Sequence, residues 1–252
     1  MARVSAVRIA LFTALVYVAT IILQVYTPAT RGYFDLGEVA IYSIAALLPP
    51  LANAVAAGVG SAIADLTTGY GYFAPGTLMI KFTEGFVVAY LMRKLAPKSR
   101  AGVAKALSIA ASVATGCAIA VAGYLRLSGL AEVSSIPIEI GGHPIASIGL
   151  KLYIPPATWI GVGAVVTAIL LYAVLVRGRE NISAAVSMLM GGLCMVLGYF
   201  LYEYFFTNPI VNHLPPIQAL VEVPVNFGQV LVGMAVALPI TSFLREARGS
   251  ED

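Results

Sequence analysis

The residues in this sequence that could do chemistry are ionisable and amide side chains set inside long apolar runs. Lys81 and Glu84 lie three residues apart in one run, so a helix would present them on one face. Glu203 lies in a later run, and Glu222 and Asn226 lie in the last one. Ionisable groups in hydrocarbon are costly and usually face a bundle interior, where they mark a ligand or ion pathway. We expect these residues to bind a small polar molecule, with mutual pairing that only stabilises the bundle as the alternative.

Three tyrosines fall near the same ends of the apolar runs as these polar groups. They are Tyr33, Tyr72 and Tyr199. Aromatic rings can stack on a flat ligand, and we include all three in the expected substrate site. For any one ring taken alone, a place in the aromatic belt at the membrane interface is the alternative.

The elements that must position these residues are helices in a lipid bilayer. Of the 252 residues, 60% are hydrophobic and 11% are charged. A soluble domain usually carries about 25% charged residues, so the composition predicts an all-α integral membrane protein. The hydrophobic segments are Ala6–Tyr26, Leu36–Leu48, Leu51–Ala64, Ala74–Leu95, Val103–Leu125, Tyr153–Val176, Ile182–Phe206 and Ile217–Leu244. The second and third are short and are separated by Pro49 and Pro50, which break a helix and predict a hairpin of two short spans or a re-entrant pair.

The basic residues orient this chain. Of 15 Lys and Arg residues, all but Lys81, Arg31, Arg126 and Lys151 fall on the side of the N-terminus. Lys81 lies within a span, and the other three fall on the opposite side. Cytoplasmic loops carry an excess of Lys and Arg, so we expect both termini in the cytoplasm.

This orientation gives the polar groups an uneven distribution in depth. A helix rises about 1.5 Å per residue, which puts Lys81 about 10 Å, Glu84 about 15 Å and Glu222 about 8 Å below the outer surface. The polar groups therefore gather in the outer half of the membrane. Such an arrangement indicates a cavity open to the outside, and disfavours a continuous proton wire or ion pore.

Enzyme and nucleotide motifs are missing from the sequence. It contains no G-x-x-x-x-G-K-[ST] phosphate loop, no H-E-x-x-H and no C-x-x-C. We expect no catalytic residue, no metal and no cofactor. Two other functions stay open: an autonomous secondary transporter of a small polar solute, and a membrane enzyme that uses Glu84, Glu203 or Glu222 as acid–base groups.

Several stretches resemble the membrane-embedded substrate-binding (S) components of energy-coupling factor (ECF) transporters, in particular the riboflavin and hydroxymethylpyrimidine branch. They are Gly32–Glu38 followed by Ala45–Leu48, Gly60–Leu66 with Gly69 and Tyr70, Phe73–Lys81 with Glu84 and Gly85, Gly198–Phe200 with Glu203, and Val223–Asn226 with Gln229. The alanines of the first segment, spaced by four residues, are similar to the A-x-x-x-A coupling motif of that family. They are Ala6, Ala10 and Ala14.

The resemblance implies a vitamin importer subunit without catalysis of its own, in a prokaryotic cell membrane. Such a subunit captures its ligand from outside, under a lid that would be Thr27–Leu36 here. It docks through its first helix onto a transmembrane coupling protein that is driven by two ATPase subunits. The resemblance implies a pocket that is formed by Lys81, Glu84, Tyr199, Glu203, Glu222 and Asn226.

The resemblance also implies the domain organisation. We expect one transmembrane domain over residues 1–252, with a six-helix core formed by 1–96 and 182–246. The additional segments over 103–176 would be a transmembrane hairpin inserted between core helices four and five. Its extracytoplasmic loop, 126–152, is rich in glycine and is expected to be irregular, with room for a short strand or an interfacial helix.

Overall fold

The computed structural model describes residues 5–27, 31–95, 129–140, 143–176 and 179–249, with isolated positions between 109 and 124. Its contacts divide the chain into two compact units. Unit 1 comprises residues 1–110 and 169–252, and unit 2 comprises residues 111–168.

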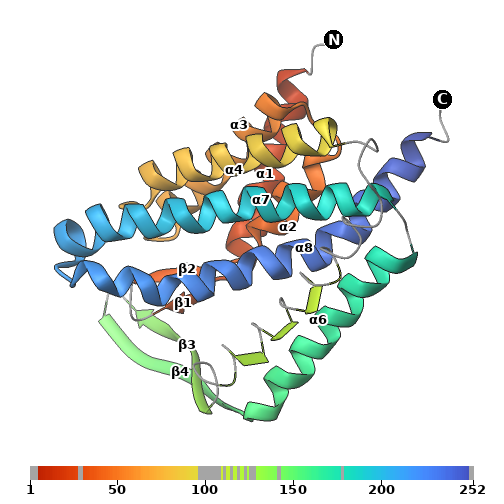
Figure 1. Ribbon diagram of the computed structural model, residues 1–252. Coiled ribbons are helices and arrows are strands. Elements are labelled where there is room, and N and C mark those ends of the chain that lie inside the picture. Colours follow the sequence, from red (N-terminus) through yellow and green to blue (C-terminus); the bar gives the residue numbers. More distant parts are fainter. Residues whose placement is uncertain are drawn as a thin grey trace. The chain divides into compact units, whose positions relative to one another are not determined.

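Unit 1 is a bundle whose helices follow the apolar segments of the sequence. It contains α1 (Ala6–Ile22), α2 (Gly37–Ala45), α3 (Pro50–Thr67), α4 (Ala74–Lys94), α7 (Arg179–Tyr202) and α8 (Ala219–Gly249). Among the described residues, these helices contact one another in the order α1, α3, α4, α7, α8, α2 and back to α1 (Figure 1). The bundle therefore closes on itself and can enclose side chains from segments far apart in the sequence.

Local sequence explains where the early helices begin and end. The hydroxyl of Ser5 caps α1 by accepting a hydrogen bond from the backbone N–H of Arg8, at 3.2 Å. Helix α2 ends at Ala45, and α3 begins at Pro50 with Pro49 as its cap residue. Proline suits the first helical position, because its missing N–H would have no partner there. The predicted break at Pro49 and Pro50 is confirmed.

Two helical stretches of the described chain are long and apolar enough to cross a membrane. They are Ser183–Asn212 and Pro216–Leu244. Shorter apolar helices cover Ala6–Ile22 and Pro156–Ala168. The fold is therefore predominantly helical, as the composition predicts, with helices that suit a bilayer.

Helix α7 continues past the predicted end of its segment. After Tyr202 the backbone passes into a π-helix over Glu203–Asn212, and the 3₁₀ turn Pro216–Gln218 leads into α8. The predicted end at Phe206 was too early. Pro209 lies within the π-helix, where a wider turn accommodates a residue that cannot donate a backbone hydrogen bond.

Two antiparallel hairpins accompany the helices. In unit 1, β1 (Val25–Thr27) pairs antiparallel with β2 (Gly32–Phe34), and Tyr26 lies opposite Tyr33. In unit 2, β3 (Gly129–Ile140) pairs antiparallel with β4 (His143–Ile154). The second hairpin replaces the irregular loop expected over 126–152. The reason is visible in Ile136, Ile138 and Ile140, which alternate with polar residues or proline at the period of two that favours a strand.

Helix α6 covers Pro156–Val176 and follows β4 directly. It corresponds to the predicted segment Tyr153–Val176, and its start at Pro156 again uses proline where a helix begins. Most of the predicted segment Val103–Leu125 lies outside the described residues.

Candidate functional site

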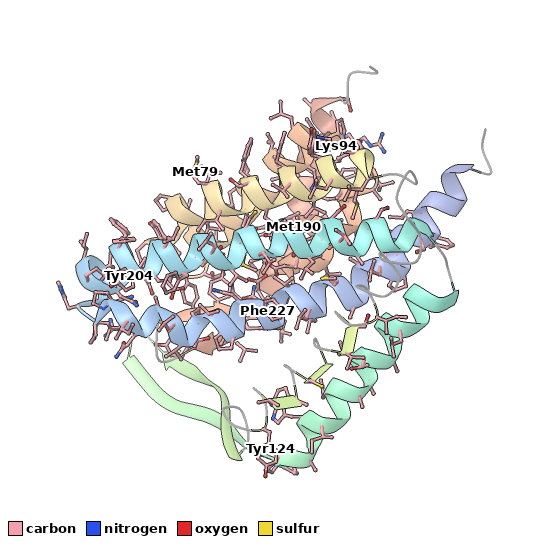
Figure 2. The ribbon with its side chains drawn as sticks, in the orientation of Figure 1. Met79, Lys94, Tyr124, Met190, Tyr204 and Phe227 are labelled. Carbon is pink, nitrogen blue, oxygen red and sulfur yellow. The ribbon has the colours of Figure 1, made fainter. Side chains whose placement is uncertain are left out.

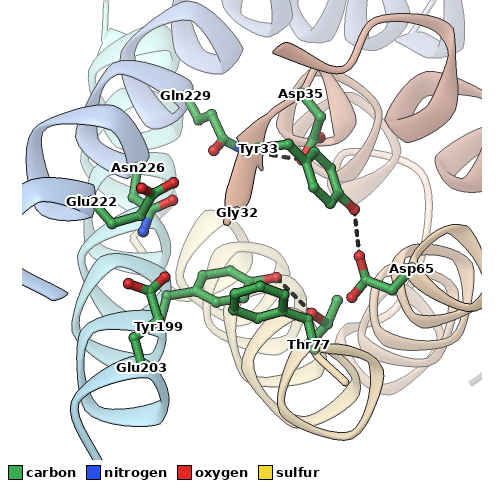
Figure 3. A pocket seen from close by; sticks show the side chains of 11 residues that line it. Gly32, Tyr33, Asp35, Asp65, Thr77, Tyr199, Glu203, Glu222, Asn226 and Gln229 are labelled. Atoms are coloured by element: carbon green, nitrogen blue, oxygen red, sulfur yellow. Dashed lines mark hydrogen bonds between the residues drawn. The ribbon is translucent and has the colours of Figure 1, made fainter. Parts of the chain in front are cut away.

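A polar pocket lies at one end of the unit 1 bundle (Figure 3). Its cavity volume is about 30 Å³. Its lining residues are Gly32, Tyr33, Asp35, Asp65, Phe73, Thr77, Tyr199, Glu203, Glu222, Asn226 and Gln229. They come from β2, α3, α4, α7, the π-helix and α8, and from loops beside these elements.

The positions of these residues along their helices define the end of the bundle. Thr77 is near the start of α4, Glu222 is near the start of α8, and Asp65 is near the end of α3. The basic residues Arg93 and Lys94 lie in the last turn of α4. Figure 2 shows Lys94 and Tyr204, which follows Glu203 closely, at opposite ends of the bundle. The pocket therefore opens at the end remote from these basic residues.

The β1–β2 hairpin covers the pocket through Tyr33. Its phenol donates a hydrogen bond to Asp65 Oδ1 on α3, as Figure 3 shows. Its ring also contacts Tyr70, with 4.4 Å between the ring centroids. The hairpin is thus tied to the far wall of the pocket by one polar and one aromatic contact.

The loop before α2 is fixed by Asp35, which is buried beside α8. One carboxyl oxygen accepts a hydrogen bond from the backbone N–H of Gly37, two residues further along the chain, at 2.6 Å. The other accepts from the Gln229 amide of α8 at 3.1 Å. The same amide lies 3.3 Å from Glu38 Oε2. Gln229 therefore links α8 to the start of α2.

Lys81 lies near the pocket residue Tyr199, in a buried ionic cluster. Its ammonium group forms an ion pair with Glu38 and lies 3.3 Å from Glu84 Oε2. Tyr42 donates a hydrogen bond to Glu84 Oε1 at 2.8 Å. The ammonium group also lies 5.7 Å from the centre of the Tyr199 ring, which lines the pocket. The cluster joins α2 and α4, and through Lys81 it contacts the pocket residue Tyr199.

The opposite wall carries two carboxylic acids from neighbouring elements. Glu203 begins the π-helix and Glu222 lies in the first turn of α8. Both are 2% exposed. Glu203 Oε2 has no hydrogen-bond partner among the described residues, and Figure 3 shows both side chains entering the pocket beside Asn226. Glu203 can therefore offer a carboxyl oxygen to a ligand in this pocket.

The structure brings five of the eight predicted substrate-site residues together. Tyr33, Tyr199, Glu203, Glu222 and Asn226 line the pocket. Lys81 and Glu84 are not among the lining residues, because their side chains are engaged with Glu38 and with Tyr42. Tyr72 does not line the pocket either; its hydroxyl donates a hydrogen bond to the Arg31 carbonyl at 2.9 Å, beside the hairpin.

Sequence reasoning did not include the remaining lining residues in the site. Asp35, Asp65 and Gln229 belong to the stretches that resemble the family, but they are not among the predicted site residues. The sequence contained a signal for two of them, because Asp35 and Asp65 are acidic residues at the predicted outer ends of apolar segments. Thr77, Phe73 and Gly32 carry no such signal and are identified by the fold alone.

The predicted docking residues lie away from this pocket. Ala6, Ala10 and Ala14 follow one stripe of α1, and each is exposed. The opposite side of α1 packs on α3, where Val16 is buried and the Gly60 position lies against the Thr13 carbonyl.

Comparison with known proteins now decides the family. The profile of the ECF-type riboflavin transporter S component matches residues 3–177, more than half of the chain. The chain belongs to this S component family. The match includes the early helices that carry Asp35, Asp65 and Lys81, and also the segment expected to be an insertion. It ends before α7 and α8.

One curated relative is also similar to this S component. It is described as "Uncharacterized protein in gap 3'region", from Pyrococcus woesei, and is 41% identical over 78 residues. The aligned part is 31% of this chain and 52% of the relative, so the chain spans about half the length of the protein it matches. The family is one of membrane transporter S components.

Proposed function

We propose that this S component is the substrate-binding subunit of an ECF-type importer and captures a vitamin or related small molecule in the pocket of unit 1. The observation that carries the proposal is the pocket itself. Side chains from α3, α4, α7, α8 and the β1–β2 hairpin converge there, and they are polar although most are buried. Buried polar groups in a membrane bundle are costly and mark a ligand site.

The proposed contacts follow the pocket wall. Tyr33 and Tyr199 supply ring faces and hydroxyls, and Glu203, Glu222 and Asn226 supply hydrogen-bonding groups. Lys81 and Glu84 would not line the pocket, and would instead hold its wall in position through their contacts with α2. Tyr72 would hold the hairpin through its bond to Arg31, so that the hairpin serves as a lid.

The pocket would face the outside, with both termini in the cytoplasm. This orientation is supported by the basic residues at the remote end of the bundle, Arg93 and Lys94 in α4 and Arg179 at the start of α7. An excess of such residues is typical of the cytoplasmic side.

A coupling protein and two ATPase subunits would complete the transporter. The exposed stripe Ala6, Ala10 and Ala14 supports docking through α1, because small residues allow a partner helix to approach closely. The six helices of the unit 1 ring would be the family core. Residues 103–176 would be an inserted hairpin, which is consistent with the separate contacts of unit 2.

The proposal is tested with purified protein in lipid nanodiscs and in liposomes. Native mass spectrometry should detect one co-purifying small molecule, and Glu203→Gln together with Asn226→Ala should remove it while the protein stays monodisperse. Liposomes that contain this chain alone should bind this compound but not accumulate it. Accumulation by this chain alone, driven by an ion gradient, would show instead an autonomous secondary transporter.

A further inference from the structure

An apolar groove lies between helix α4 and the helical stretch formed by α7 and the π-helix. Its volume is about 440 Å³, within the range of ligand pockets, which is about 300–1,000 Å³. Met79 of α4 lines one wall, and Leu201 and Phe205 line the other. Tyr202 is the one polar side chain among the described lining residues, and its hydroxyl donates a hydrogen bond to the Tyr72 carbonyl at 2.9 Å. This α4–α7 groove therefore presents hydrocarbon surface to its occupant.

Two glycines bring the walls of the groove together. A Cβ at Gly76 would lie 2.6 Å from the ring of Tyr202, and a Cβ at Gly198 would lie 2.9 Å from the side chain of Ile80. Small residues at these positions allow α4 and α7 to approach closely. Each glycine directly precedes a residue of the polar pocket, so the groove and the pocket share the same two helix segments.

The groove continues a surface that suits lipid. Ser183–Asn212 is long and apolar enough to cross a membrane, and the family is one of membrane transporter components. Met190, Leu193, Leu197 and Leu201 follow one face of α7 and are 43–57% exposed. On a membrane-spanning helix, exposed apolar side chains of this kind meet the hydrocarbon of the bilayer. The stripe ends in the α4–α7 groove, so lipid is the partner that reaches it.

The side chains of the groove favour a lipid chain over a protein helix. Helices in membranes pack through small residues or hydrogen-bonding side chains. The edges of this groove are instead bulky and exposed, since Met79 is 65% and Phe205 is 67% exposed. Its α7 wall, residues 198–206, follows the helix for roughly 10 Å, and one leaflet holds about 15 Å of hydrocarbon. Most of one lipid chain can therefore lie along it.

A basic residue lies at the end of the groove where α4 begins. Tyr72 precedes α4, and its hydroxyl donates a hydrogen bond to the Arg31 carbonyl at 2.9 Å. The Tyr72 ring contacts Phe73, with 4.9 Å between the ring centroids. Arg31 is exposed. A guanidinium group pairs readily with a phosphate, so this end of the groove suits the headgroup of a phospholipid.

We propose that the α4–α7 groove binds one hydrocarbon chain of a membrane phospholipid and that Arg31 pairs with its phosphate. The site is separate from the polar pocket and does not depend on the identity of the transported molecule. A bound chain would fill the space beside Tyr202, whose neighbour Glu203 lines the polar pocket. The lipid would thus support the pocket wall from its other side.

Native mass spectrometry of the full chain in detergent tests the site, with dioleoyl phosphatidylglycerol as the added lipid. One lipid should stay bound at a collision energy that removes all others. Met79→Trp fills the groove and should weaken this binding roughly 15-fold, the equivalent of two methylene groups leaving an apolar site. Leu201→Trp, from the opposite wall, should have the same effect. Both positions are exposed, so the thermal unfolding midpoint should change little.

Met190→Trp is the matched control, because Met190 is exposed on the same face of α7 but does not line the groove (Figure 2). It should retain the lipid. Arg31→Gln should weaken binding of the phospholipid roughly 2- to 5-fold, as expected for an exposed ion pair, but not binding of dioleoylglycerol, which lacks the phosphate. Arg8→Gln, at an exposed position of α1, should change neither.

Three results would overturn the proposal. The first is retention of the lipid by both groove variants, and the second is equal loss in the groove variants and in Met190→Trp. The third is a dimer of the chain that Met79→Trp abolishes, because a second copy would then be the occupant of the groove. If Arg31→Gln weakened phospholipid and dioleoylglycerol equally, the pairing of Arg31 with the phosphate would be wrong.

Discussion

The hydroxyl of Tyr33 and the carboxylate of Asp65 join the β1–β2 hairpin to helix α3 by a hydrogen bond across the mouth of the pocket. The two residues are 32 positions apart in the sequence, and both line the cavity. Tyr33 occupies Oδ1 of Asp65, so a ligand that contacts both carboxyl oxygens must displace the Tyr33 hydroxyl. The same hydrogen bond therefore connects the hairpin with the wall of the pocket.

The first prediction concerns this bond. Tyr33→Phe keeps the ring contact with Tyr70 and removes the hydroxyl, so the hairpin should open more often. A hydrogen bond to a charged group contributes about 1.5–3 kcal/mol, which corresponds to roughly 10- to 160-fold faster hydrogen exchange in β1 and β2. Mass spectrometry of exchanged peptides measures it. Tyr26→Phe, at the position opposite Tyr33 in the hairpin, is the control, and equal rates in both variants would contradict the prediction.

A second prediction concerns the ionic cluster near the pocket. Lys81→Met leaves Glu38 and Glu84 buried without their cation, and breaking a buried ion pair in this way costs about 3–5 kcal/mol of unfolding free energy. The thermal unfolding midpoint should fall sharply. Adding Glu38→Gln and Glu84→Gln to Lys81→Met should restore much of the loss, because no charge is then left unpaired. Lys94→Met, at an exposed position of the same helix, should change the midpoint little.

A third prediction concerns the close packing of α1 on α3. A Cβ at Gly60 would lie 2.7 Å from the Thr13 carbonyl oxygen and 2.9 Å from Val16 Cβ, so one of the helices would have to move. Gly60→Ala should therefore lower the unfolding free energy by about 1–3 kcal/mol. Gly228 in α8 has no heavy atom within 4 Å of the same position. Gly228→Ala should be neutral or slightly stabilising in the same unfolding assay, since alanine is the better helix former.

A fourth prediction separates docking from binding. Ala10→Trp places a large ring on the exposed stripe of α1, far from the pocket. Co-purification with the coupling protein should be lost, while the co-purifying small molecule should remain bound. Leu11→Trp is the matched control, because the next residue points about 100° away around the helix. Loss of assembly in both variants would mean that the stripe has no special role.

The helices of unit 1 could be predicted from the sequence, because the length of a hydrophobic segment and the position of a proline break are local signals. Pro49 and Pro50 separate α2 from α3 in the structure as they do in the pattern. The β3–β4 hairpin was missed because its glycines and prolines suggested an irregular loop, although its alternation was readable. The continuation of α7 to Asn212 was missed for a similar reason, since Pro209 normally ends a helix.

The candidate site was only partly predictable because its wall is made by tertiary contacts. Depth arguments gathered Glu203, Glu222 and Asn226 at one end of the bundle, but they could not show which side chains line the pocket. Lys81 and Glu84 lie at similar depth to lining residues, yet their side chains are engaged with α2. Which face of a helix meets the pocket depends on its neighbours, and a single sequence does not contain those contacts.

The link from Gln229 to Asp35 and Glu38 has a consequence for biogenesis. These partners are 194 and 191 residues apart, so α2 leaves the ribosome long before its amide partner is made. Until α8 inserts, the acids at the start of α2 lack this partner in the lipid. Insertion of the final helix thus supplies the last hydrogen-bond partner of Asp35 and Glu38, and the start of α2 is complete only when the whole chain has been made.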